Sequence, residues 1–247
     1  MLRRVRLGVL VPSSNTVLEP LTHDIISCLH DDQLVVSVHF SRFRVKVIDI
    51  STDATAQFEL GTIVAAAELL ADAKVDVIGW SGTSAGWLGF EVDERLCAAI
   101  EARTGIKATT STLALNRLLH KFGVQRLGLV TPYVQELNSA IRDNYRRIGI
   151  EIDESQERNL GIIDNNKIAQ VDESTLDRMV NEVVKNGATA VSTFCTNLRA
   201  AQLVENWEQQ HGIMVFDTVS TVVWDMLRMV DVEPSLVTGW GKMFSNG

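Results

Sequence analysis

The fold is decided by the stretch AVSTFCTN at residues 190–197, an apolar and β-branched run that ends in a thiol and two small polar residues. An earlier stretch, VDVIGWSGTS at residues 75–84, has the same form. Each stretch predicts a buried strand with a helix-like segment on either side of it. The later copy has Cys-Thr-Asn where the earlier copy has Gly-Thr-Ser, so one thiol stands at a duplicated turn and a glycine stands at its twin.

Outward from these two stretches, the same alternation of strands and helices occurs twice along the chain. RLGLVTP at residues 126–132 matches RLGVLVP at residues 6–12. An internal repeat of this kind is the strongest indication of architecture in this sequence. The patterns predict strands at 5–11, 34–40, 75–80, 106–109, 126–131, 149–152, 188–194 and 213–217, a polar linker at 49–53, and helices at 17–29, 54–73, 92–104, 111–122, 133–148, 173–186, 198–211 and 218–229.

This alternation predicts an α/β fold with parallel sheets and helices on both faces. Because the pattern is duplicated, we expect two similar Rossmann-like lobes, each a parallel sheet flanked by helices, related by a pseudo-twofold axis with the active site between them. The lobes are expected over 1–113 and 114–216, with 217–247 packing back onto the first. Ligands bind at the carboxyl ends of such strands, so one cleft should be faced by the turns at Pro12, Gly82, Pro132 and Cys195.

Composition argues against several classes of protein. The chain has 247 residues, 46% of them hydrophobic, and a net charge of -8, so it can bury a large core but has no basic face for nucleic acid. No apolar run is long enough to span a membrane. The first residues lead straight into a strand and leave no room for a signal peptide. The odd number and wide spacing of the cysteines favour a reducing compartment, so we expect a cytoplasmic protein. Its 3 cysteines are far apart and no metal-ligand spacing occurs, so we expect no disulfide, no metal and no cofactor.

Three further motifs accompany the twin turns: PSSNT at 12–16, TPY at 131–133 and DN at 164–165. With them, nearly the whole chain resembles the aspartate/glutamate racemase superfamily, and more closely its maleate isomerase and arylmalonate decarboxylase branch. The resemblance implies a small carboxylate substrate and a homo-oligomer, either a dimer or a tetramer. It also implies a carboxylate-binding amide, a hydroxyl that hydrogen-bonds the substrate and a second amide, at Asn15, Tyr133 and Asn165 respectively.

The chain departs from the racemases and maleate isomerases at Gly82. Enzymes of that kind carry one cysteine in each lobe, on either side of the substrate, whereas here only Cys195 is present. Arylmalonate decarboxylase is similar to this chain in having Gly-Thr-Ser at the first turn and a single cysteine at the second. It lacks the Ser-Ser-Asn opening, however, and its cysteine is followed by glycine rather than by Thr196. The sequence is therefore isomerase-like in its opening and decarboxylase-like at the missing thiol.

A single cysteine narrows the chemistry. Racemisation needs an acid/base group on each face of the reacting carbon, which one thiol does not provide. Isomerisation of maleate can begin with one nucleophilic thiolate. Decarboxylation of a malonate-type acid needs least, because one thiol protonates the enediolate that fixed donors stabilise. We therefore favour a cofactor-independent, arylmalonate-decarboxylase-like lyase acting on a small carboxylate or dicarboxylate. The alternative is a maleate cis-trans isomerase, and the second alternative is a non-catalytic small-carboxylate binding protein.

The predicted site follows from these arguments. Cys195 is the candidate proton donor or nucleophile, and a helix that starts just after it would favour its thiolate. Cys28 and Cys97 sit among apolar helical neighbours and are predicted to pack in the core. The candidate apolar walls are Trp80, Trp87, Phe90 and Phe194. The candidate substrate-binding residues are Ser14, Asn15, Gly82, Thr83, Ser84, Tyr133, Asn165, Thr196 and Asn197.

Overall fold

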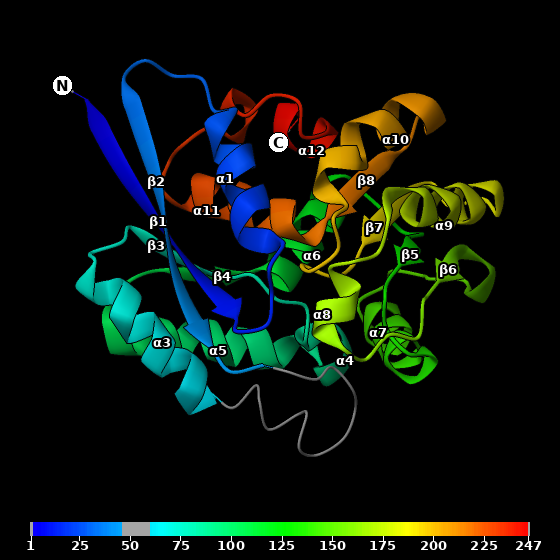
Figure 1. Cartoon of the computed structure of the whole chain (residues 1–247), viewed down its shortest axis with the longest axis horizontal. Coiled ribbons are helices and arrows are strands. Elements are labelled where there is room, and N and C mark those ends of the chain that lie inside the picture. The colour runs from blue at the N-terminus through cyan, green and yellow to red at the C-terminus, as the bar shows by residue number, and fades with distance from the viewer. Residues whose placement is uncertain (1, 46–59, 247) are drawn as a thin grey trace.

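Two parallel sheets of four strands form the framework of the molecule (Figure 1). The computed structural model describes residues 2–45 and 60–246. The first sheet has the strand order β2-β1-β3-β4 and the second has the order β6-β5-β7-β8, so the second sheet repeats the first. The strands are β1 (Arg3–Pro12), β2 (Leu34–Phe43), β3 (Val77–Trp80), β4 (Ala108–Thr110), β5 (Gly128–Val130), β6 (Glu157–Arg158), β7 (Ala190–Thr193) and β8 (Met214–Asp217). The predicted α/β fold with two parallel sheets is confirmed.

Helices cover both sheets, as the alternating sequence pattern predicts. They are α1 (Leu18–Ser27), α3 (Leu60–Asp72), α4 (Ala85–Leu88), α5 (Phe90–Thr104), α6 (Ser111–Lys121), α7 (Gln135–Arg147), α8 (Asn165–Ile168), α9 (Glu173–Lys185), α10 (Val204–His211), α11 (Thr218–Met229) and α12 (Lys242–Ser245). The polar linker predicted at 49–53 and the beginning of the helix predicted at 54–73 lie outside the described residues. The described part of that helix is α3.

The buried apolar side chains form two clusters that follow the alternation of the first sheet. Leu10, Ile78 and Trp80 belong to a smaller cluster with residues of α3 and α5. Val9 and Val77 belong to a larger cluster that continues through the second lobe. Successive residues of a strand point to opposite faces, so each face of the sheet contributes to a different cluster. The larger cluster crosses from one lobe to the other and packs them together.

Helix ends follow local chemistry that the sequence shows. Gly105 ends α5 with a φ of 72°, a left-handed conformation that glycine adopts without steric cost. Thr110 begins α6 by accepting a hydrogen bond from the backbone N–H of Leu113 at 3.0 Å. Asp217, the equivalent position at the end of β8, begins α11 by accepting from the N–H groups of Val219 and Ser220. Strand-to-helix turns of both lobes are therefore capped by the last residue of the strand.

Helix α11, in the C-terminal part of the chain, packs against the first sheet as well as against the second. It contacts β3, β4 and α6. A Cβ atom added at Gly79 of β3 would lie 2.5 Å from the sulfur of Met226, so the close approach of helix and strand requires glycine there. The division of the chain into lobes at residue 113 stays a prediction, and that position lies inside α6.

Two predicted elements of the second lobe are wrong in extent. The strand predicted at 149–152 is reduced to one isolated bridge between Arg126 and Glu151, and pairing with β5 resumes only at β6. The helix predicted at 198–211 begins later, with a 3₁₀ turn at Ala201–Leu203 and α10 from Val204. In that region the N–H of Asn197 bonds to the thiol of Cys195 instead of starting a helix. The apolar pattern of 198–203 reflects burial, which does not by itself require a helix.

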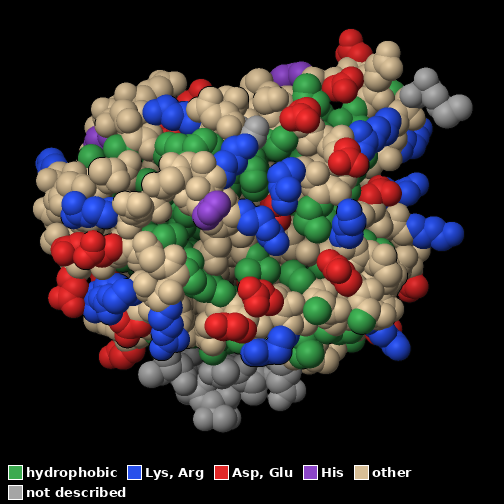
Figure 2. Space-filling view, turned by 180° about the vertical axis from the view of Figure 1, so that it is seen from behind, with side chains coloured by type: hydrophobic (Ala, Val, Ile, Leu, Met, Phe, Trp, Pro, Cys, Tyr) green, Lys and Arg blue, Asp and Glu red, His purple; other side chains and the backbone are tan. Residues whose placement is uncertain are grey.

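The surface carries charges of both signs. On the face shown in Figure 2, Lys and Arg side chains alternate with Asp and Glu among the described residues, so that face offers no broad basic area. Within the described part of the chain, every helix is too short or too polar to cross a bilayer. That the protein binds no nucleic acid stays a prediction from its net charge.

Candidate active site

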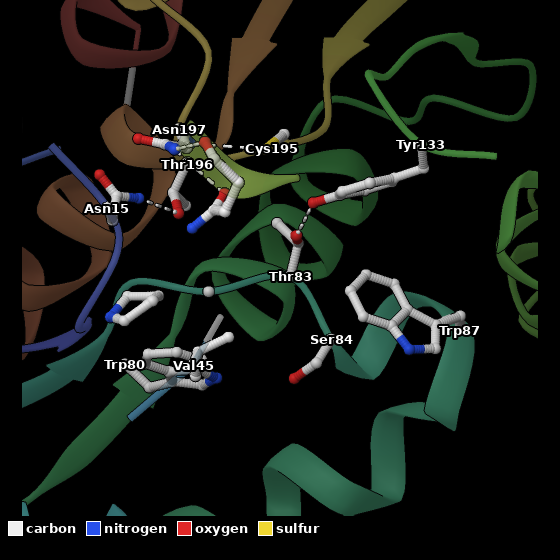
Figure 3. Close-up of a pocket in the computed structure, with 13 residues that line it drawn as sticks. Asn15, Val45, Trp80, Thr83, Ser84, Trp87, Tyr133, Cys195, Thr196 and Asn197 are labelled. Atoms are coloured by element: carbon white, nitrogen blue, oxygen red, sulfur yellow. Dashed lines mark hydrogen bonds between the residues drawn. The ribbon is translucent and has the colours of Figure 1, made fainter. Parts of the chain in front are cut away.

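A cavity lies between the two lobes, at the carboxyl ends of strands from both sheets (Figure 3). Most of its residues lie at or just after the ends of β1, β3, β5 and β7, as the twin turns predict, whereas Val45 follows β2 and Asn165 follows β6. The volume of the cavity, measured as the space open to the centre of a water-sized sphere, is about 20 Å³, which is little more than one water molecule needs. The lining residues, all of them in the described part of the chain, are uncharged: Pro12, Asn15, Val45, Trp80, Gly82, Thr83, Ser84, Trp87, Tyr133, Asn165, Cys195, Thr196 and Asn197.

One side of the cavity is an amide cluster, which we define as Asn15, Asn165, Thr196 and Asn197. The carbonyl oxygen of the Asn15 side chain accepts from the backbone N–H groups of Val17 and Leu18, at 2.9 and 3.0 Å, at the start of α1. Its NH₂ group must therefore face the other way, and it donates to the hydroxyl of Thr196 at 3.2 Å. This network fixes the orientation of the Asn15 amide, so Asn15 presents a donor where an anion could bind.

The amide cluster joins the two lobes. Asn197 donates to the backbone and side-chain oxygens of Asn165, at 2.6 and 3.0 Å, and accepts from the backbone N–H of Thr16 at 3.2 Å. Asn165 in turn donates to the hydroxyl of Ser14 at 2.9 Å. All four members of the cluster are at least nine-tenths buried. Buried amides whose hydrogen bonds are satisfied hold one geometry, so this side of the cavity is preorganised.

A hydroxyl pair, Thr83 and Tyr133, forms a second group of donors. Their oxygens lie 2.7 Å apart across the two lobes. The ring of Tyr133 is held edge-on to Trp87, with the centroids 5.3 Å apart. Burial, followed by the neighbouring Cys195, raises the pKa of the Tyr133 hydroxyl well above its ordinary value. Tyr133 therefore stays neutral and can donate a hydrogen bond to a bound oxygen.

The thiol of Cys195 is buried and protonated at neutral pH. Burial raises the pKa of Cys195 to about 11, and hydrogen bonds with Tyr133 and with the N–H of Asn197 oppose this only in part. The expectation that a following helix favours the thiolate is wrong, because α10 begins at Val204, well beyond the turn. Without a helix N-terminus beside it, the thiol has no strong positive potential to offset burial.

Comparison with known proteins agrees with this geometry. The family model of arylmalonate decarboxylase matches residues 31–244 of the chain. The chain belongs to the arylmalonate decarboxylase family. It is 29% identical to a maleate isomerase of Pseudomonas putida KT2440, over 99% of both chains. It is 25% identical to the arylmalonate decarboxylase of Bordetella bronchiseptica, over 68% of this chain and 70% of that protein.

Solved structures give the same relationship. The maleate isomerase Iso from Pseudomonas putida S16, in a cysteine-to-alanine variant with maleate, superposes with a TM-score of 0.88 at 26% identity and 98% coverage of each chain. The predicted relationship to the maleate isomerase and arylmalonate decarboxylase branch is thereby confirmed. These relatives are enzymes, and this member of the arylmalonate decarboxylase family is an enzyme of the same racemase-type superfamily.

Most residues predicted for the site of this family member meet at the cavity. Asn15, Gly82, Thr83, Ser84, Tyr133, Asn165, Cys195, Thr196 and Asn197 all line it. Ser14 does not line the cavity, but its hydroxyl accepts a hydrogen bond from the side-chain amide of Asn165, which does. Asn165, to which the second amide was assigned, is buried, whereas the adjacent Asn166 is exposed. The roles of these residues toward a substrate stay predictions.

The predicted apolar walls are only partly correct. Trp80 and Trp87 line the cavity, whereas Phe90 and Phe194 do not. Those two rings pack against Tyr145 instead, at centroid distances of 5.1 and 6.1 Å. Cys97 is buried, and the partly buried Cys28 packs against the larger cluster, so the core assignment of both fits the fold.

The sequence patterns did not indicate that Val45 lines the cavity or that Arg42 holds the turn at residues 13–15. Val45 lines the cavity, and its backbone N–H and C=O bond to the hydroxyls of the Ser13-Ser14 turn. Arg42, at the end of β2, donates to the backbone carbonyls of Ser13 and Asn15, at 3.0 Å each. No local motif marks either residue, since each acts on a turn about 30 positions earlier in the chain. The strand pairing of β1 with β2 is what brings them there.

The described residues offer no cluster of side chains typical of a metal-binding site. They contain no cluster of three or more His, Cys, Asp or Glu side chains of the kind that holds a metal ion. The donors around the cavity are amides, hydroxyls and one protonated thiol, which suit a carboxylate better than a cation. The arrangement can bind an anion, stabilise charge on its oxygens and deliver one proton.

Proposed function

We propose that the chain is a cofactor-independent, decarboxylase-like lyase acting on a small malonate-type dicarboxylate, with Cys195 as the proton donor. The observation that carries this is a single buried thiol, protonated at neutral pH, in a cavity whose walls are uncharged. At the position where the resemblance implies a second thiol in the racemases and maleate isomerases, this chain has Gly82. One proton donor is sufficient for protonating an enediolate on one face.

The reaction would run in two steps. The bond between the α-carbon and the departing carboxylate breaks, CO₂ leaves, and the electron pair passes into the remaining carboxylate to give an enediolate. The S–H proton of Cys195 is then transferred to the α-carbon, and water later returns a proton to the thiolate. Thr83, Tyr133 and Ser84 are proposed to donate to the enediolate oxygens, a contribution of roughly 3 kcal/mol to the barrier for each well-placed donor.

The apolar part of the cavity supports loss of CO₂. Pro12, Val45, Trp80 and Trp87 contribute carbon surface to the lining. An ionised carboxylate placed against such surface loses hydration, whereas uncharged CO₂ does not. The walls therefore raise the free energy of the dicarboxylate relative to the product, provided that the retained carboxylate is held by donors elsewhere in the cavity.

Maleate cis-trans isomerisation is the second candidate, and the amide cluster is the observation that favours it. Asn15, Asn165 and Asn197 converge beside Cys195 and could hold a second carboxylate throughout the reaction. The overall similarity to the maleate isomerases points the same way. An isomerase of this kind needs the thiolate of Cys195 as nucleophile, and burial opposes its formation until substrate binds.

The decisive assay supplies purified protein with malonate, methylmalonate, phenylmalonate and maleate, and follows CO₂ release and fumarate formation separately. We expect CO₂ from at least one malonate and no fumarate from maleate. Fumarate formed from maleate without CO₂ release from any malonate would replace the lyase with the isomerase. The matched control for Cys195→Ala in this assay is Cys97→Ala, since Cys97 is a buried thiol that does not line the cavity.

We further propose that the enzyme is a cytoplasmic homo-oligomer that binds no nucleic acid. Support comes from the family resemblance, from three cysteines that are not paired in disulfides, and from the net charge of -8. Light scattering on the purified protein measures its mass in solution. A monomer at micromolar concentration would contradict the oligomer.

A further inference from the structure

The space beside Gly82 is filled by a tryptophan. A Cβ atom added to Gly82 would lie 2.1, 2.3 and 2.7 Å from three carbon atoms of the Trp80 indole. Distances that short are far inside van der Waals contact, so a side chain at residue 82 and the indole of Trp80 cannot occupy their places together. Figure 3 shows Trp80 beside Val45, on the side of the cavity away from Cys195 and Asn197.

The backbone does not by itself require glycine at this position. Gly82 is not among the residues with a positive φ, so an L-amino acid could adopt its backbone conformation. The three atoms nearest to the added Cβ all belong to the indole. That ring is fixed, because Trp80 is 1% exposed, pairs with Leu10 at the end of β3 and packs on Phe43 at a centroid distance of 4.9 Å.

The indole also borders two cavities. The second has a volume of about 160 Å³ and is lined by Leu60, Ile63, Trp80, Ser84, Val92, Asp93, Arg95 and Leu96. Trp80 and Ser84 are the residues that both cavities share. Removing the outer ring of Trp80 would therefore join the small cavity beside Cys195 to a larger and mainly apolar space.

We propose that Trp80 is the residue that keeps the site in its single-thiol form and sets the size of the substrate. Its indole takes the volume that a side chain at position 82 would need, and it walls off the space into which a bulky substituent on the reacting carbon would extend. The first part rests on packing alone. The second part rests on the proposed function and implies a substrate whose substituent is small, such as methylmalonate rather than phenylmalonate.

A double-mutant cycle on stability tests the first part without any substrate. Gly82→Ala adds only the Cβ atom, and we expect it to lower Tm by roughly 3–10 °C in the wild-type background. Trp80→Leu keeps an apolar side chain but lacks the ring atoms that would clash. In the Trp80→Leu background we expect Gly82→Ala to change Tm by less than about 2 °C.

Gly86→Ala is the matched control for this cycle. A Cβ at Gly86 would lie 2.5 Å from the ring of Phe194, and no atom of Trp80 is among its close neighbours. Its effect on Tm should therefore be the same in both backgrounds. Equal losses for Gly82→Ala with and without the indole, or no loss in the wild type, would overturn the packing part of the proposal.

Discrimination between substrates tests the second part. We expect Trp80→Leu to raise the ratio of kcat/KM for phenylmalonate to that for methylmalonate by about tenfold or more. If neither wild type nor variant turns over any malonate, the proposed function fails, and the ratio of Kd values for the two malonates replaces the kinetic ratio. An unchanged ratio would overturn the role of Trp80 in substrate size, whatever the outcome of the stability cycle.

Discussion

The two strand-to-turn junctions that face each other across the cavity are built alike but filled differently. β3 and β7 occupy the same place in their sheets, and each runs into a small polar turn at the carboxyl edge. Trp80 ends β3 and pairs with Leu10, whereas Thr193 ends β7 and pairs with Val130. Two residues further on stand Gly82 and Cys195. The repeat therefore preserves the backbone and exchanges the volumes of the side chains.

The difference teaches how one fold can hold either one thiol or two. Residues two apart along an extended chain lie on the same side, so the last strand residue and the turn residue compete for space. The hydroxyl of Thr193 donates to Asp217 at 2.8 Å, and this small side chain leaves the Cys195 thiol its place. Across the cavity the indole of Trp80 takes the corresponding place, and glycine is what remains possible.

The largest effect is expected from removing the only thiol of the pair. Cys195→Ala should lower kcat/KM by roughly 10²–10⁴-fold, because it removes the proposed proton donor and leaves only hydroxyls, which are much weaker acids than a thiol, in the lining. Binding of a non-reacting dicarboxylate, followed by calorimetry, should change little, since the donors remain in place. Full activity in Cys195→Ala would show that the asymmetry between the two turns has no catalytic meaning.

The hydroxyl pair gives the next largest effect. Tyr133→Phe removes a donor whose oxygen lies 2.7 Å from that of Thr83, and kcat should fall by about 10²–10³-fold with a smaller change in KM. Tyr145→Phe is the matched control, because the buried Tyr145 hydroxyl has no hydrogen-bond partner in the described residues. A similar loss of kcat in both variants would mean that Tyr133 matters for packing only.

The pH profile then distinguishes a proton donor from a nucleophile at Cys195. The pKa of the thiol is raised to about 11, so the thiol is protonated throughout the neutral range. If the thiol donates a proton, kcat/KM should stay level from about pH 7 to pH 9.5 and fall only as the pH approaches the pKa. If the thiolate attacks, the rate should instead rise about tenfold per pH unit over that range. The expected result is the level profile.

Much of this site could be predicted from the sequence, because parallel sheets bring the carboxyl ends of their strands to one edge. The twin turns fix Gly82 and Cys195 on opposite lobes, and the opening motif brings Asn15 to the same edge. Capping chemistry also follows from local sequence. These predictions depend only on strand order and on residues next to the strand ends, which a single sequence displays.

The rest depended on packing and on long-range contacts. The sequence marks Trp80 as an apolar wall, but only the position of its ring shows that it excludes a side chain at Gly82. The prediction of a thiolate at Cys195 is wrong because the buried residues that follow the turn do not form the expected helix, and α10 begins only at Val204. Val45 was missed because it reaches the cavity through the pairing of β1 with β2, which no local pattern reveals.

The smallest effect concerns the turn at residues 13–15 that follows β1. The corresponding turn after β5 in the second lobe is held by Thr131. In the second lobe the hydroxyl of Thr131 accepts from the N–H of Tyr133 at 3.2 Å, a purely local contact. In the first lobe Arg42 donates to the carbonyls of Ser13 and Asn15 from another strand. Arg42→Ala should raise KM by roughly three- to tenfold with little change in kcat, because the Asn15 turn loses two hydrogen bonds.

Glu19→Gln separates this positioning role from surface charge. Glu19 pairs with Arg42 at 2.9 Å, but both side chains are partly exposed, at 28% and 38%. Exposed pairs of this kind contribute little, so Glu19→Gln should change KM by less than about threefold. If Glu19→Gln raised KM as much as Arg42→Ala, the ion pair rather than the two carbonyl contacts would hold the turn. A larger rise in KM for Arg42→Ala than for Glu19→Gln would instead show that the turn at residues 13–15 is held by Arg42, which the pairing of β1 with β2 brings to it. The corresponding turn of the second lobe is held by the local contact of Thr131 and needs no such residue.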